Sequence, residues 1–127
     1  MRHSIAIIDS DATSQQALRA LLSVLNVDVS SYATADQYFN RTGADESTAC
    51  VLVDAALDDM TGVQLLKKIR LTDLDLPVIV LAADGDVNVA VDAIRHGATD
   101  FIEKSQLDIA LLRRVAELLR DPVAHGR

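Results

Sequence analysis

Several residue types that define common functional classes are scarce in this chain. It contains a single cysteine, Cys50, so no internal disulfide can form. It has no tryptophan, two tyrosines and two phenylalanines, so aliphatic residues must build its core. No apolar run approaches the roughly 18 residues of a membrane-spanning helix, and the first such run meets Asp9 too early for a signal peptide. These absences predict a cytoplasmic, globular protein that does not contact a membrane.

Positive charge is also in deficit. Twelve Lys and Arg residues stand against 19 Asp and Glu residues, giving a formal net charge of −7 in 127 residues. Such a surplus of negative charge repels phosphate backbones, so we expect no direct binding of nucleic acid. The length suits one domain, and residues 1–127 are taken as a single unit.

Short apolar runs alternate five times with segments of helical periodicity. The predicted strands cover residues 5–8, 27–32, 50–53, 78–81 and 101–102. The run at 27–32 alternates apolar and polar residues, as a half-buried edge strand does. The alternation of strands and helices is typical of an α/β fold, in which helices cover a parallel sheet.

Capping residues mark where the helices begin and end. Segments 34–37 and 61–64 each fit a capping box, with Thr first and Gln three residues later. Asp86 is expected to cap a fourth helix, which Gly97 ends in a left-handed conformation. The last helix is predicted over residues 105–119. On the fourth helix the buried stripe is predicted to comprise Val87, Ala90, Val91 and Ile94, leaving Val89 and Ala93 outside it.

Acidic side chains follow the predicted strands at the point where each strand ends. Asp9 and Asp54 each end a buried strand, where a carboxylate is costly unless it is paired. Ligands of open parallel sheets bind at this carboxyl edge, where Lys104 follows the fifth strand. Asp9, Asp11 and Asp54 offer oxygen ligands for a divalent cation such as Mg²⁺. A carboxylate beside a cation and a lysine is also suited to accept a phosphoryl group.

Purely structural interpretations stand beside these functional ones. Helix N-capping is expected for Asp11, Asp58, Asp84 and Asp86. Taken by itself, Lys104 fits a surface ion pair as well as it fits a functional site. Cys50 fits a small core residue, and the three histidines at 3, 96 and 125 lack metal-ligand spacing.

In their order along the chain, these residues resemble the receiver domain of bacterial two-component response regulators, a CheY-like family. The resemblance covers nearly the whole chain. It implies a doubly wound (βα)5 flavodoxin-like fold, with a five-stranded parallel sheet of order 2-1-3-4-5 and helices on both faces. The matching segments are Ile7-Ile8-Asp9, Val51-Leu52-Val53-Asp54, Asp59-Met60-Thr61-Gly62, Gly85-Asp86-Val87, Arg95-His96-Gly97-Ala98 and Asp100-Phe101-Ile102-Glu103-Lys104.

The resemblance also implies roles for particular residues. Asp54 corresponds to the phosphoacceptor, Asp9 to the first acid of a metal-binding pair, and Lys104 to the lysine that contacts the phosphoryl group. Phe101 occupies the position of the aromatic switch residue, and Ala56 would offer its backbone carbonyl to the metal. The implied partners are a histidine kinase or another signalling protein, and a second copy bound through the fourth helix, fifth strand and fifth helix.

Three positions depart from the family pattern. Ser10 stands where the family has a second acid, and Asp11, one residue later, replaces that acid only in part. Ala82 stands where a Thr or Ser donates a hydrogen bond to the phosphoryl oxygen, so the usual switch is lost. Each of these two losses removes on the order of 1 to 3 kcal/mol of phosphoryl or Mg²⁺ stabilisation. Ser105 replaces the usual proline after the lysine.

Three functions are therefore weighed. The first is an atypical receiver that acts mainly through protein–protein contacts, with weak Mg²⁺ binding and impaired or absent phosphorylation of Asp54. The alternative is a conventional Mg²⁺-dependent phosphoacceptor, phosphorylated on Asp54 by a histidine kinase, that tolerates Ser10 and Ala82. A remote third is a flavodoxin-like cofactor carrier, although few aromatic residues are available to stack on a flavin. In the first two, no enzymatic activity is expected beyond self-phosphorylation and dephosphorylation at Asp54.

Overall fold

A single parallel sheet organises the molecule. The computed structural model describes residues 2–41 and 48–120, and within them five strands pair in the order β2-β1-β3-β4-β5. The predicted α/β class and strand order are confirmed. The strands are β1 His3–Ile8, β2 Val27–Tyr32, β3 Thr48–Asp54, β4 Val78–Ala82 and β5 Asp100–Glu103.

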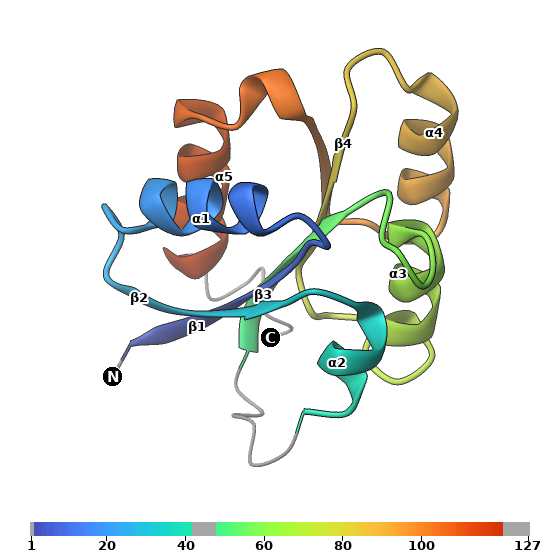
Figure 1. The fold of residues 1–127 in the computed structure, drawn as a ribbon, viewed down its shortest axis with the longest axis horizontal. Helices are drawn as coiled ribbons and strands as arrows, with labels where there is room; N and C mark the ends of the chain where they lie inside the picture. The colour runs from blue at the N-terminus through green and yellow to red at the C-terminus, as the bar shows by residue number, and fades with distance from the viewer. Residues whose placement is uncertain (1, 42–47, 121–127) are drawn as a thin grey trace.

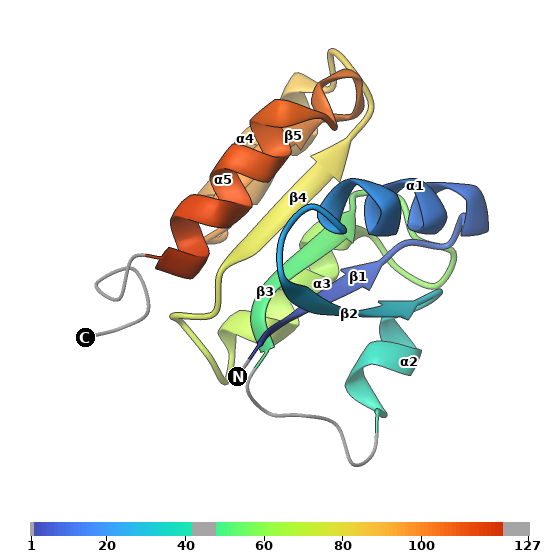
Figure 2. The same cartoon turned by 90° about the vertical axis from the view of Figure 1, so that its left-hand side faces the viewer.

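Helices cover both faces of this sheet. Helices α1 and α5 lie against one face, and α2, α3 and α4 lie against the other (Figures 1 and 2). The helices are α1 Ala12–Leu22, α2 Ala35–Phe39, α3 Gly62–Arg70, α4 Val87–Arg95 and α5 Ile109–Arg120, with a short 3₁₀ turn η1 at Lys104–Gln106. Within the described ranges, no helix has the length and apolar character needed to cross a membrane.

Two apolar layers, one on each face, form the core. Because side chains alternate along a strand, Cys50 and Leu52 of β3 pack towards α1 and α5, while Val51 and Val53 pack towards α2, α3 and α4. Strand β2 lies at the edge of the sheet, as its alternating sequence predicts. Cys50 is fully buried, and this burial raises the pKa of its thiol to about 12. Its predicted place in the core is confirmed.

Several predicted caps are present, and two are not. Asp11 accepts a hydrogen bond from the Thr13 N–H, Asp86 accepts one from the Val89 N–H, and the capping box of α3 is complete. In α2, Thr34 caps the helix as predicted, but the Gln37 side chain bonds the Ala33 N–H instead of the Thr34 N–H. The predictions for Asp58 and Asp84 are wrong, because α3 begins only at Gly62 and α4 only at Val87, too far along the chain for either to be the N-cap.

The predicted burial of α4 is wrong. The outer face carries Val87, Val91 and Ile94, which are 67%, 50% and 54% exposed, whereas Ala93 is fully buried and Val89 packs on the core. Six of its nine residues are apolar, and Asn88, Asp92 and Arg95 form one narrow polar stripe, so the pattern leaves a wide apolar face and does not define which part of it is buried. The small Ala93 lies against the sheet, and the larger apolar side chains are left outside. Gly97 ends this helix region with a φ of +97°, as predicted.

The last helix begins later than predicted. Residues 104–106 form the 3₁₀ turn, and α5 starts at Ile109, where the Asp108 carboxylate accepts a hydrogen bond from the Ala110 N–H. This cap stops α5 from extending back to Ser105. Leu111, Val115 and Leu118 of α5 are buried in the core.

Candidate functional site

Two carboxylates lie side by side at the carboxyl edge of the sheet. Strands β1 and β3 are neighbours, with Ile8 paired to Val53, so the residues that follow these two positions, Asp9 and Asp54, come close together. Their exposed fractions are 2% and 7%, and they are the two buried charged residues of the part of the chain that the structure describes. A buried carboxylate needs compensating partners, because burial disfavours its charge.

Lys104 supplies the positive charge at this edge. Its Nζ lies 2.8 Å from Oδ2 of Asp54, although the two residues are fifty positions apart in sequence. The other carboxylate oxygen, Oδ1, accepts the N–H of Ala56 at 3.0 Å. Both oxygens of Asp54 are therefore engaged, and the structure brings Asp9, Asp54 and Lys104 together as the predicted sheet order requires.

The protonation equilibria of this site reflect burial and mutual charge. Burial raises the pKa of Asp9; the Asp11 N–H, which donates to Oδ1 at 2.9 Å, opposes this rise, and the charge of Asp54 adds to it. Burial disfavours the charged form of Lys104, but the hydrogen bond to Asp54 and the nearby negative charges outweigh it, so the pKa of Lys104 is raised above its ordinary 10.5. The site holds more acid than one lysine balances.

Ser10 and Asp11 have other partners. The Ser10 hydroxyl donates to the carbonyl of Ala33 at 2.7 Å and accepts the N–H of Asp58 at 3.0 Å. Asp11 turns towards its own helix, where Oδ1 accepts the Thr13 N–H and Oδ2 accepts the Ser14 hydroxyl. Neither side chain is directed to Asp54 by these bonds.

These contacts test whether the residues fit a Mg²⁺ ion, which prefers near-octahedral oxygen ligation. Asp9, Asp54 and the backbone carbonyl of Ala56 are the groups that remain to hold it. No group of three or more metal-ligating His, Cys, Asp or Glu side chains occurs among residues 2–41 and 48–120. A Mg²⁺ ion here would be held by two carboxylates and one carbonyl, and would keep water as its remaining ligands.

The loop after β4 is tied to the end of β5. Ala82 ends β4 and is 1% exposed, with no hydroxyl to offer. The Ser105 N–H donates to Oδ1 of Asp84 at 3.1 Å, and the Gly85 N–H donates to Oε2 of Glu103 at 2.7 Å. A proline at position 105 would have no N–H to donate. These two bonds hold the start of α4 against β5.

Phe101 lies beside this loop. It pairs with Val80 in the sheet and packs, half-buried, against the core below α4. It also lines a surface pocket with Val87 and Ala90 of α4. The predicted switch aromatic therefore contacts the helix whose outer face is apolar.

Sequence reasoning missed the role of Asp59. Its two carboxylate oxygens accept the N–H groups of Ala35 at 3.1 Å and Asp36 at 3.0 Å, so it caps α2 from the loop after β3. Although desolvation opposes the effect, the hydrogen bonds from Asp36 and Ala35 lower the pKa of Asp59. No local pattern signals a cap whose helix lies more than twenty residues away.

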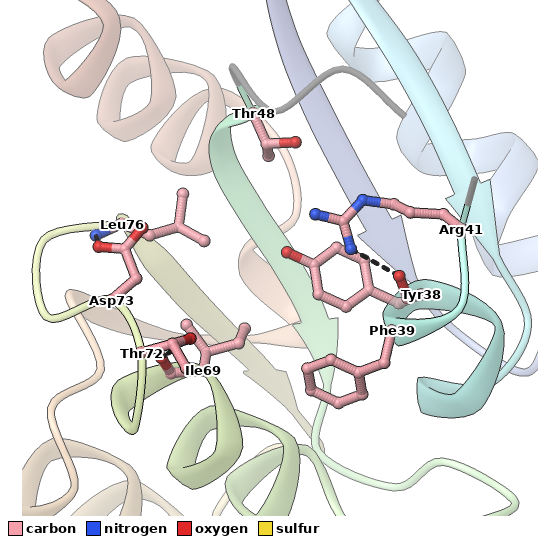
Figure 3. Close-up of a pocket in the computed structure, with 8 residues that line it drawn as sticks. All are labelled: Tyr38, Phe39, Arg41, Thr48, Ile69, Thr72, Asp73 and Leu76. Atoms are coloured by element: carbon pink, nitrogen blue, oxygen red, sulfur yellow. Dashed lines mark hydrogen bonds between the residues drawn. The ribbon is translucent and has the colours of Figure 1, made fainter. Parts of the chain in front are cut away.

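A second hollow lies at the other end of the sheet. It measures about 180 Å³ and lies between α2 and α3, where Tyr38, Phe39, Ile69 and Leu76 meet polar side chains (Figure 3). The guanidinium of Arg41 lies 4.0 Å from the centre of the Tyr38 ring. None of the predicted site residues lines it.

The chain belongs to the response regulator receiver domain family, whose model matches residues 5–116. The match places this chain among the receiver domains of two-component response regulators. The family match agrees with the strand order and with the position of Asp54 at the carboxyl end of β3.

Individual relatives and solved structures are similar to this chain in sequence and in fold. The transcriptional regulatory protein FixJ of Azorhizobium caulinodans is 29% identical over 97% of this chain and 58% of its own length. The C4-dicarboxylate transport regulator DctD of Rhizobium meliloti is 37% identical over 80% of this chain and 22% of its own length. The chain thus spans less than two thirds of either relative.

Among solved structures, the BeF3-activated DrrB receiver domain has a TM-score of 0.85 and 26% identity, covering 95% of this chain and all of that one. A receiver protein from Pseudoalteromonas atlantica has a TM-score of 0.82 and 30% identity, covering 91% and 96% of the two chains.

Proposed function

We propose that this chain is an atypical receiver domain that acts mainly through protein–protein contacts, with phosphorylation of Asp54 impaired or absent. Its partners are a histidine kinase or another signalling protein, in the cytoplasm, and it makes no direct contact with nucleic acid or membrane. It has no enzymatic activity beyond phosphoryl transfer to and from Asp54. The observation that carries this proposal is the Ser10 hydroxyl, which is engaged by Ala33 and Asp58 where the family pattern calls for an acid.

The charge balance at Asp54 supports impaired phosphorylation. Transfer of a phosphoryl group onto a carboxylate brings several negative oxygens together and needs fixed positive charge and hydrogen-bond donors to stabilise them. Here Lys104 is the cation in contact with Asp54, Asp9 adds a further negative charge, and Ala82 offers no hydroxyl. Mg²⁺ binding to Asp9, Asp54 and the Ala56 carbonyl is accordingly proposed to be weak.

The outer face of α4 supports an output through protein contacts. Val87, Val91 and Ile94 follow one another at spacings of four and three residues, so they form one exposed apolar stripe. Ile109 at the start of α5 is 66% exposed as well. We propose that this stripe binds a second copy of the chain through the face formed by α4, β5 and α5. A Val91→Glu substitution should then convert a dimer measured by analytical ultracentrifugation into a monomer.

Exposure to a small phosphodonor tests the central part of the proposal. The protein is incubated with acetyl phosphate and Mg²⁺ and its intact mass is measured, with Asp54→Asn as the matched control. The proposal predicts that wild-type and Asp54→Asn chains show no phosphoryl adduct. A stable adduct in the wild type that is absent from Asp54→Asn would sink it.

A conventional phosphoacceptor remains the second candidate. The 2.8 Å contact between Lys104 and Asp54, with Asp9 adjacent, favours it, because these three residues match the family's acceptor site. It predicts Mg²⁺-dependent shifts of the amide signals near Asp9 and Asp54. The family match gives no support to a flavodoxin-like carrier, for which a coloured purified protein would be expected.

A further inference from the structure

One hydroxyl group connects three loops at the acidic edge. Ser10 lies between β1 and α1, its acceptor Ala33 lies between β2 and α2, and its donor Asp58 lies between β3 and α3. The bonds measure 2.7 and 3.0 Å and join residues that are 23 and 48 positions apart. Both are long-range contacts made by a single side chain.

Only a neutral group that both donates and accepts can make this pair of bonds. A hydroxyl has one donor hydrogen and two acceptor lone pairs, whereas an ionised carboxylate can only accept. A carboxylate at position 10 would therefore face the Ala33 carbonyl without a hydrogen to share. It would also add negative charge beside Asp9 and Asp54, which are already buried there.

Asp59 joins the β3–α3 loop to the start of α2 a second time. Its carboxylate caps α2 by accepting the N–H groups of Ala35 and Asp36. The loop after β3 is further closed by the Gly62 N–H, which donates to the Ala55 carbonyl at 2.8 Å. Ser10 adds the β1–α1 loop to this connected set, beside the Asp9 N–H, which donates to the Tyr32 carbonyl at the end of β2 at 2.9 Å.

We infer that Ser10 is a positioning residue. Its two hydrogen bonds hold the backbone beside Asp54 in the observed arrangement, and this does not require a divalent cation. The inference rests on the proposed function in one respect, the weak binding of Mg²⁺. It adds that the loops need no cation to hold them together. The arrangement of the β1–α1, β2–α2 and β3–α3 loops is then the same in the presence and absence of Mg²⁺.

The Asp58 amide reports directly on this contact. Its solvent exchange and chemical shift are measured by ¹H–¹⁵N NMR on the 127-residue chain, first in EDTA and then with MgCl₂ added. In the wild type both should be unchanged by MgCl₂. Ser10→Ala should speed exchange of the Asp58 amide about tenfold, the effect of losing one hydrogen bond, and Ser10→Thr should restore the wild-type rate.

Two further variants separate positioning from a general loss of structure. Ser14→Ala removes a hydroxyl that bonds only Asp11 in the same turn, and it should leave the Asp58 amide unchanged. Ser10→Asp keeps an acceptor for the Asp58 N–H but has no hydrogen to donate to the Ala33 carbonyl, so its Asp58 amide signal should shift when MgCl₂ is added, because the new acid then binds the cation.

Two results would overturn the inference: an Asp58 amide that exchanges at the wild-type rate in Ser10→Ala, or one that responds to MgCl₂ in the wild type. Its failure is distinguishable from failure of the proposed function. A phosphoryl adduct on Asp54 together with an Asp58 amide that ignores MgCl₂ would reject the proposed function and leave the role of Ser10 intact.

Discussion

Replacement of Lys104 by methionine is the sharpest test of how Asp54 is held. Lys104 keeps its Nζ 2.8 Å from Asp54 Oδ2, and the two side chains are 39% and 9% exposed. Methionine preserves much of the length and apolar stem of the side chain while removing the charge. The substitution removes the ion pair of Oδ2 and leaves a buried carboxylate whose Oδ1 still accepts the Ala56 N–H.

The structure sets the size of the expected loss. At this separation, with an effective dielectric constant of about 20, the Coulomb attraction alone is about 6 kcal/mol, and desolvation offsets most of it. Removing one partner of a fully buried pair costs about 3 to 5 kcal/mol. Because more than a third of the Lys104 side chain is exposed, solvent screening reduces this value, and we expect a loss of about 2 kcal/mol in the free energy of unfolding.

Urea unfolding of a double-mutant cycle measures this loss. Lys104→Met, Asp54→Asn and the double variant are compared with the wild type. Lys104→Met should cost about 2 kcal/mol in the wild type and less than half as much in the Asp54→Asn background. Lys67→Met, at an exposed position of α3, serves as the control and should change stability by less than about 0.5 kcal/mol. Equal losses for Lys104→Met in both backgrounds would refute the reasoning.

Three further substitutions probe the surroundings of the site. Asp9→Asn should stabilise the protein at pH 7: burial raises the pKa of Asp9, so ionisation opposes folding and the gain should appear only as pH rises above 3.8, which denaturation curves across pH will show. Gly62→Ala should destabilise by about 2 kcal/mol or more in urea unfolding, because its Cβ would lie 2.5 Å from the Asp54 carbonyl oxygen; a neutral result would contradict the close approach. Glu103→Ala should release the Gly85 amide and speed its hydrogen exchange about tenfold, whereas an unchanged rate would show that the loop after β4 is held otherwise.

The sequence predicted those parts of the fold that depend on local pattern. Alternation of apolar runs and helical segments indicated a parallel sheet. The resemblance to receiver domains supplied the sheet order, which brings Asp9, Asp54 and Lys104 to one edge. The capping box at Thr61 was predictable because both partners lie within four residues.

The remaining features depend on contacts that no local pattern records. The Ser10 hydroxyl finds its partners 23 and 48 residues away, and Asp59 caps a helix that lies earlier in the chain. The buried face of α4 was assigned wrongly because apolar residues cover most of this short helix outside one polar stripe, and Ala93 rather than the larger side chains packs against the sheet. Ser10 departs from the family pattern, and its residue type alone does not reveal the structural role that its two bonds give it.

If Ser10 and Ala82 prevent efficient phosphorylation of Asp54, restoring an acid and a hydroxyl at these two positions should permit it. The most direct measurement is the fraction of phosphorylated Asp54, by intact mass, in the wild type and in a Ser10→Asp, Ala82→Ser double variant, both incubated with acetyl phosphate and Mg²⁺. We expect no adduct in the wild type and a clear adduct in the double variant that Asp54→Asn abolishes. Equal adducts in the wild type and the double variant would contradict it.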